Sequence, residues 1–388
     1  MAVLTAAAFL IFAQAFMVAP ILPQLAHSFH ASPGTVGLSV PAYLVPCGAM
    51  TLVWGSISDH VGRRPVILSS LAVFTVLTAL TGLVDSTGAF VGIRLATGIG
   101  ASGVVPISLA LIGDVFPYAS RGRALGWLFG GMAGGIAVGS SAGALTEPLI
   151  GWPGLFALVA GAAFILLVAA LVAGVLPPST LPSCPSSLPE VLAGYRRLVS
   201  HGRGLRTYSY ILLNAMLHSG IYTWLGLYLQ QRFSLGPIGI GVALLGYGLP
   251  GFILGPLIGH LADRYGRGRI IPAGVALAAL TALLLAAPLP LIVVALVIAV
   301  LSLGYDMTQP LFGGIVTDLP GRRGQALGLN AFFLFTGFGL GSLIFQALLP
   351  FGFAAALTIC GIPALIAAAA AIPLFRNEQP HMRKDVMK

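Results

Sequence analysis

The stretch Gly55-Ser-Ile-Ser-Asp-His-Val-Gly-Arg-Arg-Pro65 gathers one acid, one His and two Arg in a chain that is otherwise poor in charge. A similar stretch, Gly259-His-Leu-Ala-Asp-Arg-Tyr-Gly-Arg-Gly-Arg269, returns 204 residues later. Each stretch separates two long apolar runs. We therefore expect two equivalent polar loops, each between a pair of helices.

The composition predicts an integral membrane protein. Of the 388 residues, 57% are hydrophobic and only 7% are charged, and the mean hydropathy is +0.99. Soluble domains contain roughly 45–50% apolar residues. The 19 Lys and Arg occur in short clusters between apolar runs, which argues against a nucleic-acid partner. The three Cys lack disulfide or metal-ligand spacing, and no nucleotide-binding or nucleophile motif is present, so we expect no metal, no cofactor and no enzymatic activity.

Twelve apolar stretches are each long enough to cross the ~30 Å of hydrocarbon in a lipid bilayer. They cover residues 2–27, 34–57, 65–84, 87–115, 124–146, 153–176, 206–232, 237–259, 270–287, 289–317, 325–347 and 352–374. No basic residue precedes the first stretch, and a signal peptide begins with a positively charged segment, so we do not expect this stretch to be a cleaved signal peptide. Pro20 and Pro23 are expected to bend this first helix.

The stretch between the sixth and seventh helices is rich in Pro and Ser and cannot form a membrane helix. We therefore predict an N-terminal six-helix bundle over residues 1–176, a cytoplasmic linker over 177–205, a C-terminal six-helix bundle over 206–375 and a cytoplasmic tail over 376–388. With the N-terminus inside, every Lys and Arg except Arg94 and Arg232 falls on the inner side. Because cytoplasmic loops collect positive charge, both termini are predicted to be cytoplasmic, in the inner (plasma) membrane.

The two halves form an internal repeat. At an offset of 204 residues, Tyr43 matches Tyr247, Asp59 matches Asp263, and the match continues through Gly, Pro and Arg positions as far as Asp114 and Asp318. Chance similarity between apolar helices would match Leu, Ala and Val instead. We infer an all-α membrane protein in which two six-helix bundles are related by pseudo-twofold symmetry.

Two six-helix halves, a long inner loop and the pattern Gly-x-x-x-Asp-x-x-Gly-Arg in both halves resemble the major facilitator superfamily (MFS) over essentially the whole chain. Arg94-Leu-Ala-Thr-Gly98 resembles the fourth-helix motif of proton-coupled members. Helix five, with glycines at 131, 135, 139 and 143, partly resembles the antiporter signature, but Ser140 stands where that signature has Pro. The resemblance implies a monomeric transporter that binds a small-molecule substrate and protons, most like the exporters of drugs and metabolites.

Asp306 is the best candidate for proton coupling. It precedes Asp318 by twelve residues of one helix, about 18 Å at 1.5 Å per residue, which places it near the middle of the bilayer. An acid at that depth is costly and usually functional; the alternative is an Asp bonded to neighbouring helices.

His218 shares a helix face with Asn214 and Tyr222, which suggests a cavity wall, although a lone buried His is more often a satisfied core residue. Arg94 lies about 12 Å from the outer end of its helix. It either extends toward the outer surface or, as the resemblance implies, faces substrate or assists proton transfer. We predict proton coupling by Asp306, His218 and Arg94. The predicted substrate cavity is lined by Gln14, Tyr43, Asn214, His218, Tyr222, Tyr247 and Asp306.

The charged loops are predicted to form an inner gate. The resemblance implies that Asp59 and Arg63 together hold the inner ends of the two halves in contact. The second loop has Gly268 in place of the second Arg and would form the weaker contact. The simpler alternative is that these Arg only set topology. The predicted gate residues are Gly55, Asp59, Gly62, Arg63, Arg64, Asp114, Asp263, Arg267 and Asp318.

The predicted function is proton-coupled export of a small organic molecule by alternating access, at a site between the two bundles. Ser140 leaves open an uptake facilitator or a proton symporter. A further alternative is a non-transporting sensor or lipid-handling protein with the same fold. Such a protein would be expected to have lost the charged loop motifs and to have no acidic residue near the middle of the bilayer.

Overall fold

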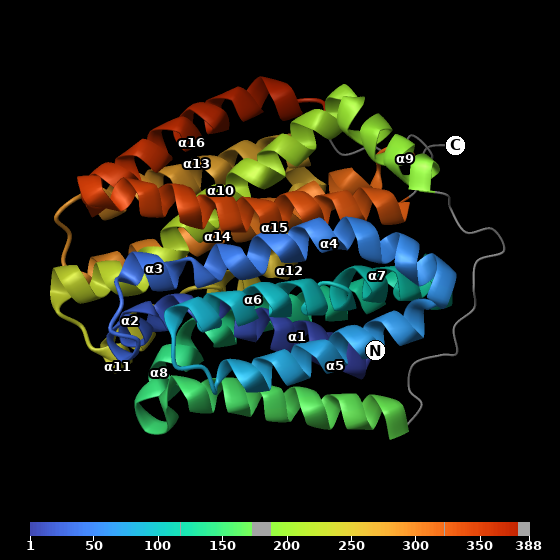
Figure 1. The fold of residues 1–388 in the computed structure, drawn as a ribbon. Helices are drawn as coiled ribbons and strands as arrows, with labels where there is room; N and C mark the ends of the chain where they lie inside the picture. Colours follow the sequence, from blue (N-terminus) through green and yellow to red (C-terminus); the bar gives the residue numbers. More distant parts are fainter. Residues whose placement is uncertain (117, 173–187, 322, 379–388) are drawn as a thin grey trace.

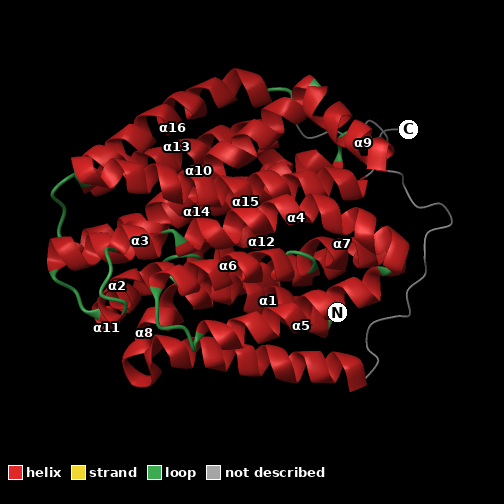
Figure 2. Ribbon diagram, viewed as in Figure 1, coloured by secondary structure: helices red, strands yellow, loops and turns green. Residues whose placement is uncertain are grey.

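The computed structural model describes residues 1–116, 118–172, 188–321 and 323–378. Over these residues the chain is helical and contains no strand (Figure 2). The helices are α1 (Ala2–Phe16), η1 (Ala19–Ile21), α2 (Leu22–Ser28), α3 (Pro33–Gly37), α4 (Ser39–Val61), α5 (Arg63–Thr81), α6 (Thr87–Ala101), α7 (Val104–Val115), α8 (Tyr118–Val172), α9 (Leu188–Ser200), α10 (Gly202–Phe233), α11 (Pro237–Ala243), α12 (Leu249–Tyr265), α13 (Arg267–Ala286), α14 (Leu291–Thr317), α15 (Arg323–Leu348), η2 (Leu349–Phe351) and α16 (Phe353–Phe375).

These elements form the twelve expected membrane helices. In the described part of the chain, nine helical stretches are long and apolar enough to cross a membrane, and one of them is most of α8. Gly151, at φ 69°, bends α8 into two arms, as expected for the fifth and sixth helices. Helix α10 and the pair α11–α12 are the seventh and eighth. The first helix leaves the α conformation after Phe16 and resumes as α2, so the bend predicted at its prolines is confirmed.

The twelve helices form two bundles that lie against each other (Figure 1). Helices α1 to α8 make one bundle and α10 to α16 the other, and α4 packs along α15 where they meet. Glycines allow this contact: a Cβ at Gly48 would lie 3.0 Å from the Thr336 hydroxyl, and a Cβ at Gly339 would collide with Val45. The N-terminus and the end of α16 lie at the same end of the molecule (Figure 1).

The glycines of α8 pack against α1, inside the first bundle. A Cβ at Gly131 would lie 2.6 Å from the carbonyl oxygen of Thr5, and a Cβ at Gly139 would lie 2.5 Å from that of Ala13. Repeating every four residues, they form one strip of small residues that allows two membrane helices to approach closely. Their spacing therefore serves close packing within one half.

Two elements differ from the sequence prediction. The stretch 188–200, predicted as linker, is the helix α9, on which Val191, Tyr195 and Leu198 form one stripe at helical spacing. The Tyr195 hydroxyl donates to the carbonyl oxygen of Leu52 in the first half, and Gly194 lies against Gln325 in the second. The eighth helix is interrupted between α11 and α12, where Gly248 takes a φ of 80°.

Candidate functional site

The two charged loops have the same backbone geometry. Gly62, between α4 and α5, has φ 95° and ψ 158°; Gly266, between α12 and α13, has φ 88° and ψ 144°. A positive φ of this size favours glycine because it has no Cβ. Gly55 lies within α4, and a Cβ there would meet nothing within 4 Å. The glycines at 62 and 266 are therefore explained by the turn they make.

Arg63 and Arg267, at equivalent positions of the two loops, each form an ion pair within their own bundle. Arg63 Nη1 lies 2.7 Å from Asp59 Oδ1, and Arg63 Nε donates to Asp114 Oδ2 at 3.2 Å. Arg267 Nη1 donates to Asp318 Oδ2 at 2.8 Å, which is the equivalent pair of the second half. These pairs join helices within one half, so a direct hold on the other half stays a prediction.

The Gly of the second loop has a packing role of its own. The backbone amide of Gly268 donates to the carbonyl oxygen of Glu378 at 3.0 Å, and a Cβ at Gly268 would collide with the carbonyl oxygen of Phe375. An Arg, as at position 64 of the first loop, would not fit there. The side chain of Asp263, another predicted gate residue, lies outside the described residues.

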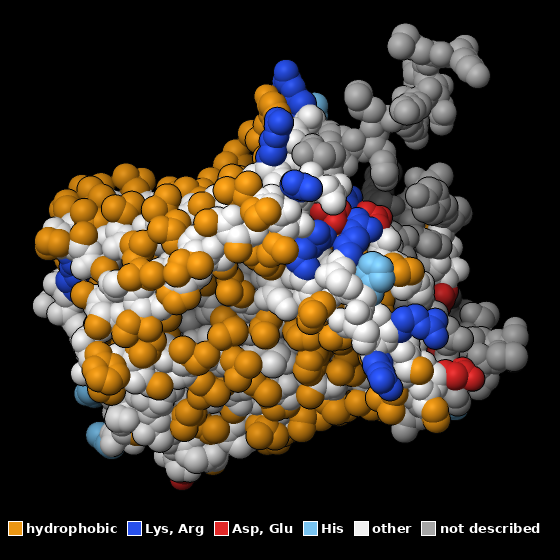
Figure 3. All heavy atoms as spheres, turned by 90° about the horizontal axis from the view of Figure 1, so that it is seen from above, with side chains coloured by type: hydrophobic (Ala, Val, Ile, Leu, Met, Phe, Trp, Pro, Cys, Tyr) orange, Lys and Arg blue, Asp and Glu red, His pale blue; other side chains and the backbone are white. Residues whose placement is uncertain are grey.

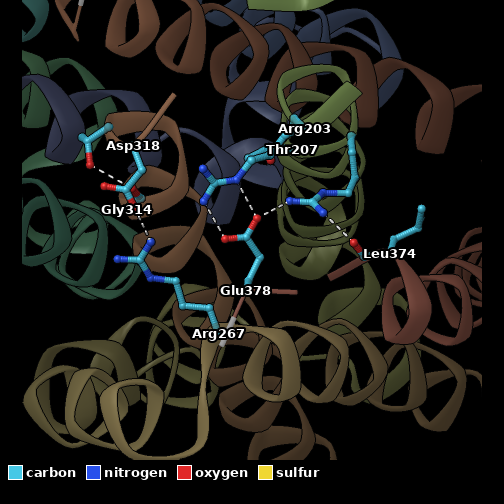
Figure 4. Close-up of polar contacts among 9 residues, drawn as sticks. Arg203, Thr207, Arg267, Gly314, Asp318, Leu374 and Glu378 are labelled. Carbon is cyan, nitrogen blue, oxygen red and sulfur yellow. Dashed lines mark hydrogen bonds and ion pairs between the residues drawn. The ribbon is translucent and has the colours of Figure 1, made fainter. Parts of the chain in front are cut away.

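Glu378 is clamped by two Arg of α10 (Figure 4). Arg203 donates from Nε to Oε1 at 2.8 Å and from Nη2 to Oε2 at 2.7 Å, and Arg206 Nη2 donates to Oε1 at 2.5 Å. The Glu378 side chain is only 7% exposed. Burial alone would raise the pKa of this carboxyl, but the hydrogen bonds and charges of Arg203 and Arg206 outweigh burial and lower it. Sequence reasoning placed Glu378 in the cytoplasmic tail and gave it no role.

Four predicted cavity residues of the second half come together in a buried polar and aromatic cluster. The Tyr247 hydroxyl lies 2.6 Å from His218 Nε2, and the Tyr222 ring stacks on the Tyr247 ring with centroids 4.4 Å apart. His218 also stacks on Tyr305, which sequence reasoning missed although it precedes Asp306. The Tyr222 hydroxyl donates to the carbonyl oxygen of Phe16, so this cluster reaches the first bundle.

Asn214, the fourth, donates from Nδ2 to the Thr308 hydroxyl at 2.8 Å. It therefore joins α10 to α14 one helical turn from His218. Asn214 is 1% exposed, His218 4% and Tyr222 2%. The stripe predicted from the i, i+4 spacing is real, and in this conformation it is packed and not open to solvent.

Asp306 faces the interruption of the eighth helix. The Ser302 hydroxyl donates to Asp306 Oδ2 at 3.0 Å, and the backbone amide of Gly251, in the first turn of α12, also donates to the carboxylate. The Ser302 oxygen in turn accepts from the backbone amide of Gly248 at 2.8 Å. A carboxylate is favourable at a helix N-terminus, where backbone amides and the helix dipole meet it. A Cβ at Gly251 would collide with the Asp306 carboxyl group, so this contact depends on glycine at position 251.

The predicted residues of the first half form a second cluster around Arg94, which is 0% exposed. Arg94 Nη1 donates to Gln14 Oε1 at 2.7 Å, and Nε donates to the carbonyl oxygen of Ser39 at 3.4 Å. The guanidinium carbon lies 4.1 Å from the centroid of the Tyr43 ring. Arg94 therefore faces inward between α1 and α4, and the alternative of extension toward the outer surface is excluded.

The predicted cavity set is thus divided between two buried clusters, one in each bundle. Sequence reasoning missed Ser39, Ser302, Tyr305, Thr308 and Glu378. Ser302 is four residues before Asp306, on the same helix face, which is a usable signal. In the part of the chain that the structure describes, no three His, Cys, Asp or Glu side chains gather as metal ligands would.

Comparison with known proteins places this geometry in a family. The sequence profile of the Major Facilitator Superfamily matches residues 4–333 and again 211–387. The chain is 31% identical over 274 residues to the uncharacterized MFS-type transporter YceJ of Bacillus subtilis (strain 168), covering 69% of this chain and 68% of the relative. It is 30% identical over 142 residues to the chloramphenicol resistance protein of Pseudomonas aeruginosa, covering 36% and 34%. The crystal structure of the human organic anion transporter MFSD10 superposes with a TM-score of 0.73 at 20% identity, covering 96% of this chain and 98% of that one, which shows the shared fold.

Proposed function

Because the chain belongs to the Major Facilitator Superfamily, whose members are multi-pass membrane transporters of small molecules and not enzymes, we propose that it exports a small organic molecule by proton-coupled alternating access. The observation that carries this proposal is the carboxylate of Asp306. Its hydrogen-bond donors, the Ser302 hydroxyl and the Gly251 amide, are neutral. Among the described ion pairs none involves Asp306, so it can take up and release a proton without breaking one.

A proton on Asp306 would change the start of α12. Ser302 now donates its hydroxyl hydrogen to Oδ2 while accepting from the Gly248 amide. If that oxygen is protonated, the hydroxyl must turn away, and the first turn of α12 loses the negative charge that faces it. Proton binding is thereby linked to the interruption between α11 and α12.

That interruption is well placed to transmit movement between the bundles. Helix α11 packs extensively against α8 of the first bundle, whereas α12 packs mainly against α13 and α14 of its own bundle and touches α8 to a lesser extent. A change at Gly248 would therefore shift a segment held mainly by the other half relative to one held mainly by its own half. His218 and Tyr247 stand beside the same interruption and are the second proposed proton-handling group. Arg94 belongs to a separate cluster, so its predicted part in proton coupling would be indirect.

The inner side is assigned from charge. Figure 3 shows most of the visible Lys and Arg at one end of the molecule, with most of the visible acids, while apolar side chains cover much of the remainder of this face. The α9 segment lies at this end, as do the N-terminus and the end of α16 (Figure 1). The positive-inside rule supports a cytoplasmic position for this end, in an inner (plasma) membrane. We propose the bundle, linker and tail boundaries predicted above, a monomer embedded in the bilayer, and an inner gate based on the pairs of Arg63 and Arg267.

A second candidate, an uptake facilitator or proton symporter, is favoured by one observation. Ser140 is buried within α8 and its hydroxyl bonds to the carbonyl oxygen of Ala137, so helix five continues where the antiporter signature has Pro. A non-transporting role is the least supported, because the ion pairs of both charged loops are formed and the deep acid is present.

A flux screen tests the proposal. The purified protein is reconstituted in proteoliposomes, and labelled chloramphenicol, sugars and amino acids are supplied with the pH gradient set in either direction. Proton-coupled export predicts that at least one compound accumulates on the side with the lower pH, by exchange for protons. Accumulation on the opposite side would show symport, and movement indifferent to the gradient would show facilitation. Either result would overturn proton-driven export.

A further inference from the structure

The cluster around Arg94 contains more hydrogen-bond donors than its protein partners accept. A guanidinium group has no acceptor atom, so Gln14 must present Oε1 to it and its amide nitrogen must point elsewhere. Within the described residues, Gln14 Nε2, Arg94 Nη2, the Tyr43 hydroxyl and the Ser39 hydroxyl are buried without a hydrogen-bond partner. All four groups can donate. The group that would satisfy them must be an acceptor.

The cluster also contains an uncompensated positive charge. None of the described ion pairs involves Arg94, although its side chain is fully buried among α1, α4 and α6. A buried charge without a partner is strongly unfavourable. The cation–π contact with Tyr43 offsets only part of this cost.

Arg232, the other Arg outside the inner clusters, shows how such a side chain can be satisfied by the fold itself. Its Nη2 donates to the carbonyl oxygens of Ala287 at 2.8 Å and Leu289 at 3.2 Å, and its Nη1 donates to that of Leu285 and to the Tyr228 hydroxyl. It is also partly exposed to solvent. Among the described residues Arg94 has only two protein acceptors, Gln14 Oε1 and the carbonyl oxygen of Ser39, its Nη2 has none, and its side chain is not exposed to solvent. Hydrogen bonding within the first bundle therefore satisfies Arg94 only in part.

We propose that Arg94, Gln14 and Tyr43 form the subsite for a carboxylate group of the transported molecule, and that the substrates of this transporter are therefore organic acids carried as anions. A carboxylate supplies one negative charge and about four lone pairs in a planar arrangement that suits a guanidinium edge. It would accept from Arg94 Nη2, Gln14 Nε2 and the Tyr43 hydroxyl together. The single positive charge of Arg94 matches a monovalent anion.

This inference rests on the proposed transport function, because it names the substrate class of that transporter. It is nevertheless tested separately, by binding in the absence of any pH gradient. The probes are three pairs that differ only in charge: benzoate and benzamide, salicylate and salicylamide, and 2-naphthoate and 2-naphthamide. Each is titrated against the purified, detergent-solubilised full-length protein at pH 7, with sulfate, which carries no carboxylate, as the only other anion.

We expect at least one acid to bind about tenfold or more tightly than its amide, since hydrogen bonds to charged groups are the strong ones. Arg94→Gln should remove this preference. Gln14→Glu should remove the preference as well. Its carboxylate, placed 2.7 Å from Arg94 Nη1, would form an ion pair with the guanidinium inside the protein, and the substrate carboxylate could no longer pair with it. The second variant compensates the buried charge, so it keeps the test valid if Arg94→Gln fails to fold. Arg232→Gln is the matched control and should retain the preference.

Equal binding of acids and amides in all three pairs, or no binding of any acid, would overturn the subsite. So would an acid preference that survives both Arg94→Gln and Gln14→Glu. If chloride, added in place of sulfate, competes fully with the acids at equimolar concentration, the site binds inorganic anions and the assignment to substrate is wrong. A protein that shows the acid preference but no proton-driven flux would refute only the proposed coupling, whereas proton-driven flux of neutral compounds without acid preference would refute only the subsite.

Discussion

Replacing Glu378 with Gln should release the segment after α16 from the N-terminal end of α10. The carboxylate accepts two hydrogen bonds from Arg203 and one from Arg206, and its side chain is 7% exposed, against 34% for Arg203 and 14% for Arg206. Removing one partner of a fully buried ion pair costs about 3–5 kcal/mol. Because water reaches the two Arg, we expect about 2 kcal/mol here, which corresponds to roughly a 30-fold change in the equilibrium of local opening.

Hydrogen exchange read by mass spectrometry measures this opening directly. In Glu378→Gln, the amide of Gly268, which donates to the backbone oxygen of residue 378, and the peptide that covers 374–378 should exchange roughly 30-fold faster. The exposed Glu190 of α9 provides the control, because Glu190→Gln should leave these peptides unchanged. Unchanged exchange in Glu378→Gln would refute the reasoning that this clamp holds the segment.

The same clamp predicts a pH dependence. The pKa of Glu378 lies below its ordinary value of 4.5 in the folded protein, so its ionised form is favoured by folding. The stabilisation is therefore fully present above pH 4.5 and is lost as the pH falls through the lowered pKa. Protection of the 374–378 peptide, corrected for intrinsic exchange, should be constant from pH 8 to 5 and decline only below that range. A decline that begins near pH 6 would contradict the assignment to this carboxylate.

Three further variants test the packing and the site. Gly139→Val should lower the melting temperature in detergent by an amount equivalent to about 1–3 kcal/mol, because a Cβ at position 139 would lie 2.5 Å from a carbonyl oxygen of α1. Gly130→Val is the control and should leave the melting temperature unchanged, because a Cβ there would meet nothing within 4 Å. Equal melting temperatures for the two variants would contradict the close packing. Gly251→Ala should displace the Asp306 carboxylate and reduce proton-driven flux at least tenfold while the protein remains folded, and full flux would show that this contact is dispensable. Tyr195→Phe should remove the 3.2 Å hydrogen bond from α9 to α4, at a cost of about 1 kcal/mol. Hydrogen exchange of the α9 backbone amides should become faster. Unchanged hydrogen exchange would show that apolar packing alone holds that helix.

Most of the fold could be predicted from the sequence because it is encoded in length, hydropathy and a repeat. The ion pairs from Arg63 to Asp114 and from Arg267 to Asp318 both span 51 residues, as the repeat requires. The interruption of the eighth helix could not be predicted. Glycines such as Gly248 are common in membrane helices, and the contact that defines this break, from Ser302, comes from another helix.

Most residues of the two buried clusters were named from the sequence, but their grouping was not. Spacing along one helix placed Asn214, His218 and Tyr222 on a common face, and they do lie together. Spacing carries no information on which helices meet, so the pairing of Gln14 with Arg94 across α1 and α6 was not foreseen. The tail acid at Glu378 lacked any local pattern at all.

The most direct test of proton-coupled export is transport by Asp306→Asn. Asn has the same shape and can still accept from the Ser302 hydroxyl and the Gly251 amide, so the start of α12 should keep its structure, but it cannot take up a proton in the cycle. The account predicts that accumulation of substrate driven by a pH gradient is lost in proteoliposomes while exchange of labelled for unlabelled substrate persists. Asp85 is an exposed acid, so the variant Asp85→Asn serves as the matched control and should transport normally. Accumulation in Asp306→Asn that equals the wild type would contradict the central claim.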